Sequence, residues 1–223
     1  MKYGAIWDVD GTLVDTAELH FAAWEAVCGE RGRPFTRADF AATFGRRNPE
    51  ILAALFGDGL TGPEAEAFAD RKEALYREAA RRGGVRPLPG VVPLLEGLRR
   101  AGVRQAIGSS APRANLDLIL DVMGVAPYFE AVVGAEETQR GKPDPQVFLV
   151  AAQRLGIPPS RCVVLEDAVA GVEAARAGGM KSIAVRFVGH HPEEALRRAG
   201  ADLVVPTLEQ VSADDVLRLL GAP

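Results

Sequence analysis

From residue 85 to the C-terminus, short apolar runs rich in β-branched residues alternate with segments of helical periodicity. These runs have the length and composition of buried strands, and they fall at 103–107, 131–133, 161–165, 182–185 and 203–205. Strands that alternate with helices along a chain form a parallel sheet with helices on both faces. We therefore predict an α/β fold with a doubly wound parallel sheet.

A further strand-like run, 5–7, opens the chain and is separated from the others by a long helical stretch. Helical periodicity in this stretch is strongest at 18–27, 37–43, 48–56 and 63–82. In the remainder of the chain it is strongest at 91–101, 113–123, 146–155 and 208–220. We predict an α/β core of residues 1–16 and 85–223, with a small inserted helical-bundle domain of residues 17–84.

The composition excludes several classes of protein. The hydrophobic fraction of 48% and the charged fraction of 25% are typical of an ordinary globular protein. A net charge of -4 without a basic cluster argues against a nucleic-acid partner. Cys28 and Cys162 are far apart, which suits reduced thiols, and the sequence shows neither a leader nor an apolar run of about 18 residues. We expect a cytoplasmic monomer with no membrane partner.

Several predicted strands end in residues with reactive or charged side chains. These are Asp8 with Asp10, Ser109 with Ser110, Lys142 just beyond a strand and turn, and Glu166 with Asp167. The carboxyl ends of parallel strands meet at one edge of a sheet, so these groups should converge. Carboxylate oxygens suit Mg²⁺, and hydroxyl, amide and ammonium groups suit phosphoryl oxygens. The set is typical of Mg²⁺-assisted phosphoryl transfer.

The chain resembles the haloacid dehalogenase superfamily of phosphotransferases. The four motifs of that family appear in order as Asp8-Val9-Asp10-Gly11-Thr12, Ser109, Lys142-Pro143 and Glu166-Asp167. The resemblance covers essentially the whole chain, and it implies that the helical insertion is the mobile cap of this family.

The resemblance also implies roles for these motif residues. Asp8 would be the nucleophile that forms an aspartyl-phosphate, and Asp10 the general acid/base. Mg²⁺ would be held by the Asp8 side chain, the Asp10 carbonyl and Asp167, with Glu166 adjacent.

The phosphoryl group of a small phosphorylated substrate would bind to the remaining motif residues, namely Ser109, the Ser110 amide and Lys142.

Within the superfamily, residues 15–24 resemble the β-phosphoglucomutase group, which isomerises a sugar phosphate through a bisphosphate. In that group His20 would lie near the general acid/base and help to couple cap closure to proton transfer. His20 is also spaced to pack beside Trp24, which is a purely structural alternative. Arg46 and Arg47 are adjacent in a loop and are candidates to clamp a phosphate, or they are solvated surface arginines.

One departure from the mutase pattern leaves the outcome of the reaction open. Where mutases place a small polar cluster that holds a distal phosphate, this chain has Ala111-Pro112-Arg113, and Arg113 is the candidate replacement. A phosphatase of sugar monophosphates needs no such site, so we expect a phosphatase, with a true mutase as the alternative. A 2-haloacid dehalogenase and a non-catalytic phosphoacceptor or binding module are further alternatives.

Two other features are interpreted as structural. Lys72 is predicted to be a solvated helix lysine beside Glu73, although a phosphonate-cleaving relative would need such a lysine for a Schiff base. His190 and His191 are predicted to lie in a loop before a helix rather than in a metal site, because adjacent side chains in extended structure diverge.

Overall fold

A computed structural model of the chain describes residues 2–222. The structure divides into two compact units. The core unit comprises residues 2–15 and 86–222, and the helical unit comprises Thr16–Val85.

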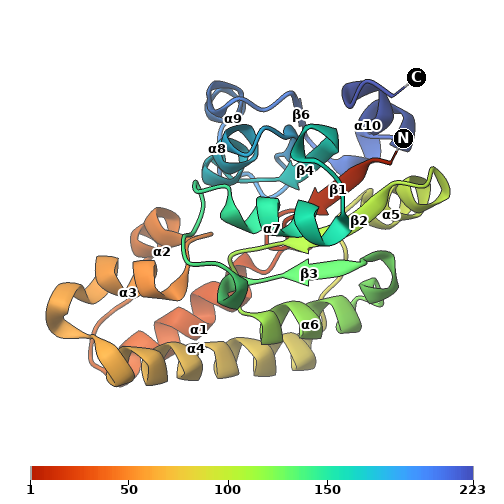
Figure 1. Cartoon of the computed structure of the whole chain (residues 1–223). Coiled ribbons are helices and arrows are strands. Elements are labelled where there is room, and N and C mark those ends of the chain that lie inside the picture. Colours follow the sequence, from red (N-terminus) through yellow and green to blue (C-terminus); the bar gives the residue numbers. More distant parts are fainter. Residues whose placement is uncertain (1, 223) are drawn as a thin grey trace. The chain divides into compact units, whose positions relative to one another are not determined.

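The core unit is built on a single parallel sheet of six strands, in the order β3-β2-β1-β4-β5-β6 (Figure 1). The strands are β1 (Gly4–Trp7), β2 (Arg104–Gly108), β3 (Ala131–Val133), β4 (Cys162–Glu166), β5 (Lys181–Val185) and β6 (Leu203–Val205). The predicted fold class is confirmed, and the strand bounds differ from the predicted ones by at most one residue at each end.

The order of the strands fixes where a site can form. The chain runs outward from β1 through β2 to β3, then returns to the other side of β1 and continues through β4 to β6. Strand order therefore reverses between β1 and β4, and in such sheets ligands bind outside the carboxyl ends of the strands at the reversal. Trp7 pairs with both Ile107 and Leu165, so Asp8 leaves the sheet between the ends of β2 and β4.

The helices of the core unit are α5 (Val91–Arg100), α6 (Arg113–Val122), α7 (Gln146–Leu155), α8 (Val169–Ala177), α9 (Glu193–Ala199) and α10 (Ala213–Leu219). Short 3₁₀ turns lie at η2 (Ala126–Tyr128), η3 (Ala135–Glu137), η4 (Pro159–Arg161) and η5 (Leu208–Gln210). α7 covers the centre of the sheet, where Phe148 and Leu155 join Ile6 and Val164 in one fully buried cluster. Burial of these side chains, together with Ala106 of β2 and Val133 of β3, is the main force that holds α7 to β1, β2 and β3.

The C-terminal helix differs from the prediction of one helix over 208–220. The structure has η5 and α10 instead, with Ser212 between them. The Ser212 hydroxyl accepts a hydrogen bond from the Asp215 amide (3.2 Å), and the Ser212 amide donates to the Asp215 carboxylate (3.0 Å). This reciprocal pair is a capping box, which starts a new helix at residue 213.

The helical unit consists of α1 (Ala17–Glu30), α2 (Arg37–Thr43), α3 (Asn48–Phe56), η1 (Gly57–Gly59) and α4 (Gly62–Gly83). It has a hydrophobic core of its own, in which the aromatic side chains are Phe21, Trp24, Phe35, Phe40 and Phe68. α1 packs directly against α4. The bounds of α2 and α3 are those predicted from the sequence.

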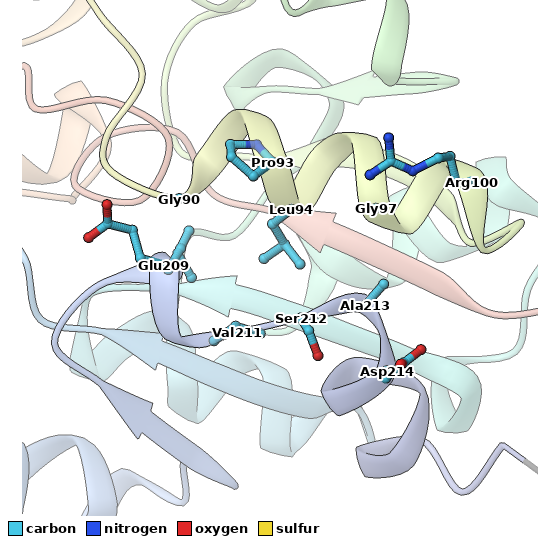
Figure 2. A pocket seen from close by; sticks show the side chains of 11 residues that line it. Gly90, Pro93, Leu94, Gly97, Arg100, Glu209, Val211, Ser212, Ala213 and Asp214 are labelled. Atoms are coloured by element: carbon cyan, nitrogen blue, oxygen red, sulfur yellow. The ribbon is translucent and has the colours of Figure 1, made fainter.

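Two other features of the fold bear on function. No helix within residues 2–222 is both long enough and apolar enough to cross a membrane. A groove of about 480 Å³ lies between α5 and the segment from η5 to α10 (Figure 2). Its wall includes Leu94, Val211 and the small residues Gly97 and Ala213. None of the residues predicted to carry chemistry lines it.

Candidate active site

Three of the predicted site residues meet in one buried ionic cluster. Lys142 Nζ lies 2.8 Å from Asp8 Oδ1 and 2.6 Å from Glu166 Oε1. Asp8 follows β1, Glu166 ends β4, and Lys142 follows η3. The three side chains are at most 10% exposed. The carboxyl ends of β1 and β4 therefore gather residues that are far apart in the sequence, with Asp8 and Lys142 alone separated by 134 positions.

Glu166 is fully engaged within this cluster. While its Oε1 accepts from Lys142, its Oε2 accepts hydrogen bonds from the amides of Asp167 (2.7 Å) and Ala168 (2.6 Å). Gly171 lies against the same carboxylate, and a Cβ atom there would overlap it. Glu166 thus holds the ammonium group of Lys142 and the turn after β4 in place, and its packing requires a glycine at position 171.

A second grouping suits a metal ion. Carboxylate oxygens of Asp8, Glu166 and Asp167 lie within 4.8 Å of one another, and all three residues are buried. Gly11 has a φ of 85°, and a Cβ atom there would overlap the Asp167 carboxylate. Glycine therefore lets the loop after β1 approach Asp167 closely. A buried set of oxygen donors fits Mg²⁺.

The electrostatics of the site favour an added cation. Burial raises the pKa of Asp8, Lys142 opposes this rise, and the charges on Glu166 and Asp10 add to it, so that the pKa reaches about 7. Burial, followed by the charges on Glu166 and Asp8, raises the pKa of Asp167 well above its usual value. Burial alone would lower the pKa of Lys142, but Asp8 and Glu166 reverse this and raise it. One ammonium group does not balance these carboxylates, so a divalent cation would stabilise their ionised forms.

We predict that Mg²⁺ raises the melting temperature of the protein. At about 100 times the dissociation constant, binding to the folded state adds about 2.7 kcal/mol to the free energy of unfolding. Protons compete for the same oxygens, so the gain should be larger at pH 8 than at pH 5. Differential scanning fluorimetry with MgCl₂ or EDTA measures the melting temperature at each pH. Asp167→Asn should lose the gain, whereas Asp202→Asn, which changes a partly exposed carboxylate paired with Lys181, should keep it. An equal rise in melting temperature in both variants would contradict the assignment of Asp167 to the Mg²⁺ site.

The serine motif lies at the same edge of the sheet. Ser109 follows β2, is 2% exposed, and donates its amide hydrogen to Val133 O (3.1 Å). Its hydroxyl oxygen accepts from the Ala111 amide (3.2 Å). Ser110 comes next and is half-buried. The roles of both serines in binding a phosphoryl group remain predictions.

Asp10 is half-buried in the loop after β1, where it forms an isolated β-bridge with Val14. Its charge raises the pKa of Asp8 and of Asp167. Its role as general acid/base remains a prediction.

Arg113 is the first residue of α6, and its side chain is engaged with other residues of the core unit. Its Nε donates to Asp117 Oδ1 (2.8 Å), and its Nη1 lies 3.5 Å from Glu137 Oε1. The hydrogen bond to Asp117 raises the pKa of this guanidinium. The predicted contact between Arg113 and a distal phosphate would have to compete with these two carboxylates.

The prediction for Lys72 was wrong. Lys72 is 2% exposed, and its Nζ lies 2.9 Å from Glu73 Oε1 and 2.8 Å from His20 Nδ1. Glu73 also accepts from Asn48 Nδ2 (2.9 Å), and the His20 ring stacks on Tyr76 at 4.1 Å. The helical unit thus contains a buried polar cluster that sequence reasoning missed.

The spacing of apolar residues along α4 indicates that Lys72 is buried. Phe68, Lys72, Tyr76 and Ala80 recur every four residues, and all of them are buried. Residues four apart lie on one face of a helix, so the apolar neighbours of Lys72 indicated an inward position.

The other predicted residues of the helical unit are placed as follows. Arg46 is exposed in the loop between α2 and α3, and Arg47 is half-buried at the N-cap position of α3. Their contacts with substrate remain predictions. In the core unit, His190 and His191 lie in the loop between β5 and α9, as predicted.

A doubly wound sheet with buried carboxylates and a lysine at the ends of β1 and β4 defines an α/β enzyme with an acidic active site. Residues 4–179 match the model of the haloacid dehalogenase-like hydrolases, so the chain belongs to this family of hydrolases. Within the family it lies near the β-phosphoglucomutase-like and CbbY-like phosphatases.

Similar proteins agree with this placement. The chain is 35% identical to fructose-1-phosphate phosphatase YqaB of Escherichia coli over 187 residues, which cover 83% of this chain and 97% of that protein. It is 34% identical to hexitol phosphatase A of Escherichia coli over 218 residues, which cover 94% and 93%. The crystal structure of β-phosphoglucomutase from Clostridium difficile has the same fold, with a TM-score of 0.88, 24% identity and coverage of 99% and 98%.

Proposed function

We propose that this protein is a Mg²⁺-dependent phosphatase that hydrolyses a small sugar phosphate through an aspartyl-phosphate on Asp8. The observation that supports it best is the buried contact of Lys142 with both Asp8 and Glu166, beside Asp167. A carboxylate held against an ammonium group at the ends of β1 and β4 is positioned for a phosphoryl group that carries negative charge.

The reaction takes two steps. The Asp8 carboxylate attacks phosphorus, the ester P–O bond breaks, and the leaving oxygen takes a proton from Asp10. A water molecule then gives a proton to Asp10 and attacks phosphorus, the bond between phosphorus and Asp8 breaks, and inorganic phosphate leaves. Lys142 neutralises negative charge throughout, and Ser109 and the Ser110 amide hold phosphoryl oxygens.

The metal ion would be held by the side chains of Asp8 and Asp167 and by the carbonyl of Asp10, with Glu166 adjacent. When bound, Mg²⁺ supplies positive charge next to the phosphoryl oxygens. Glu166 serves this arrangement through Lys142, because both of its oxygens already have protein partners.

The substrate class is supported by the relatives. Fructose-1-phosphate phosphatase and hexitol phosphatase both take their names from phosphorylated sugars or sugar alcohols, and this chain spans almost the whole length of each. The helical unit supplies His20, Arg46 and Arg47 as candidate substrate contacts.

A phosphate-release screen tests the proposal. Fructose 1-phosphate, sorbitol 6-phosphate and glucose 6-phosphate are offered to the purified chain with MgCl₂ or with EDTA, and inorganic phosphate is measured by a colorimetric assay. We expect Mg²⁺-dependent release from at least one of them. Absence of release from all of these, and from a wider panel of sugar and nucleotide phosphates offered in the same assay, would contradict the proposal and favour a non-catalytic phosphoacceptor.

Product analysis separates the remaining alternatives. With β-glucose 1-phosphate and glucose 1,6-bisphosphate together, a mutase yields glucose 6-phosphate, whereas we expect free phosphate from any turnover. Halide release from a 2-haloacid would indicate a dehalogenase instead.

A further inference from the structure

Strand β2 carries a buried glutamine in the interior of the sheet. Gln105 is 1% exposed, and its strand lies between β1 and β3. Strands that are covered on both faces are almost entirely apolar, because an amide group without partners is costly to bury. The side-chain amide of Gln105 therefore needs partners of its own.

Both ends of the Gln105 amide make buried hydrogen bonds. Its Oε1 accepts from the indole Nε1 of Trp7 (3.1 Å), and its Nε2 donates to Leu95 O (3.0 Å). Trp7 belongs to β1 and Leu95 to α5, so one side chain joins three elements of the core unit. Water does not compete for these groups, which strengthens both hydrogen bonds.

The register of the sheet sets the two partners on one face. Gln105 pairs with Ala5, and residues two apart on a strand point to the same face, so Trp7 lies beside Gln105 on the face that α5 covers. The residue after Trp7 points to the opposite face. That residue is Asp8, whose carboxylate contacts Lys142. The anchored indole and the nucleophile therefore leave adjacent backbone positions in opposite directions.

The backbone at Asp8 is held from both of its sides. The Asp8 amide donates to Leu165 O of β4 (3.0 Å), and the preceding side chain is fixed through Gln105. Trp7 has the largest of the fully buried side chains within residues 2–222. A close-packed interior leaves a ring of this size no room to move alone, so a displacement of the indole also displaces the peptide that joins it to Asp8.

A purely structural role for the pair is the alternative. A buried indole needs an acceptor, and Gln105 would supply one whatever Asp8 does. The position of the pair favours a further role. The acceptor comes from the neighbouring strand and is itself held by α5, so the hydrogen bond fixes the end of β1 relative to the rest of the sheet. The residue that it fixes is the one before the nucleophile.

We propose that Gln105 is a positioning residue that acts through Trp7 to keep the Asp8 carboxylate in line for attack on phosphorus. It limits movement of the end of β1 while Asp8 forms and loses its bond to phosphorus. Such alignment tolerates little displacement, since a shift of about 1 Å can cost about 100-fold in rate. This inference rests on the proposed function, because it concerns the nucleophile of that reaction.

The test separates the rate of phosphoryl transfer from stability. Gln105→Met replaces the amide with a thioether that accepts only weakly, and Trp7→Phe keeps an aromatic ring but has no donor. Each variant should lower kcat about tenfold and change KM by less than about twofold. Rapid quench followed by mass spectrometry should show that the phosphoryl adduct forms on Asp8 more slowly by the same factor.

The double variant tests whether the two residues act together. When Gln105→Met and Trp7→Phe are combined, kcat should fall no further than about tenfold, because both substitutions remove one and the same hydrogen bond. Independent effects would multiply to about 100-fold.

Leu98→Ala is the control for a loss of stability alone. Leu98 is fully buried in α5, and its carbonyl accepts from the Val103 amide (2.9 Å), which places it near the start of β2, away from the site. The cavity should lower the melting temperature. At temperatures at which circular dichroism shows the variant folded, kcat should stay within about twofold of the wild type.

Each outcome decides between the two proposals. Wild-type kcat in folded Gln105→Met and Trp7→Phe, or a multiplied loss in the double variant, would overturn the positioning role and leave the phosphatase assignment standing. Failure of both single variants to fold would show that the pair is structural and would overturn the role as well. Absence of turnover by the wild type would overturn the proposed function and, with it, the positioning of its nucleophile.

Discussion

The Asp8→Asn variant is expected to lose phosphatase activity by about 10⁴-fold or more while it keeps its fold. An amide oxygen is a poor nucleophile, so no aspartyl-phosphate forms, and the other groups of the site act only through that intermediate. Asparagine has almost the shape of aspartate and its Oδ1 still accepts from Lys142, so packing at the end of β1 should be preserved. Steady-state phosphate release and circular dichroism measure the two effects.

The control for this variant is Asp15→Asn. Asp15 is an exposed carboxylate of the core unit a few residues beyond the motif, and its loss should leave turnover within about twofold of the wild type. Mass spectrometry after brief exposure to substrate should find a phosphoryl adduct on the wild type and none on Asp8→Asn. Turnover by Asp8→Asn at the wild-type rate would disprove the nucleophilic role.

The Lys142→Met variant is expected to lose both activity and stability. Lys142 is the one cation in contact with Asp8 and Glu166 within the described site, and it is 5% exposed. Methionine leaves two buried carboxylates without their partner, and breaking a buried ion pair on one side costs about 3–5 kcal/mol. Urea denaturation followed by circular dichroism measures the free energy of unfolding, and phosphate release measures the loss of activity.

Lys181→Met provides a matched comparison. Lys181 lies 2.7 Å from Asp202, almost the same separation as in the buried pair, but its side chain is 47% exposed. Water already screens this pair, so its loss should cost at most about 1 kcal/mol. Mg²⁺ should restore part of the lost stability in Lys142→Met and none in Lys181→Met, because it supplies positive charge to the same carboxylates. Equal losses in the free energy of unfolding in the two variants would contradict the claim that burial makes the ion pairs of Lys142 important for stability.

The sheet and the site could be predicted because both depend on local pattern and one topological rule. The β-branched runs located the strands, and the rule that parallel strands end at a shared edge predicted that Asp8 lies beside Lys142 and Glu166, as the structure shows. That inference needs no knowledge of side-chain packing, because the sheet alone brings the strand ends together.

The features that were missed depend on contacts between elements. Gln105 reaches the indole of Trp7 only because β2 lies beside β1, and no pattern around residue 105 indicates this. Lys72 is buried because His20 and Glu73 satisfy its ammonium group, whereas composition favours an exposed lysine. The sequence does indicate a helix start at Ser212, because an acidic residue follows this serine three positions later. Helical periodicity on both sides of Ser212 nevertheless favoured the prediction of one continuous helix.

The position of β1 has a consequence for synthesis on the ribosome. β1 is made before the helical unit and lies in the interior of the sheet, yet its partners β2 and β4 come from beyond the whole helical unit. The helical unit has its own aromatic core, and it is complete in the nascent chain while the apolar side chains of β1 are still without a sheet to join. The nascent chain must therefore keep this strand from aggregating until β4 has been made, and chaperone contact is expected at β1.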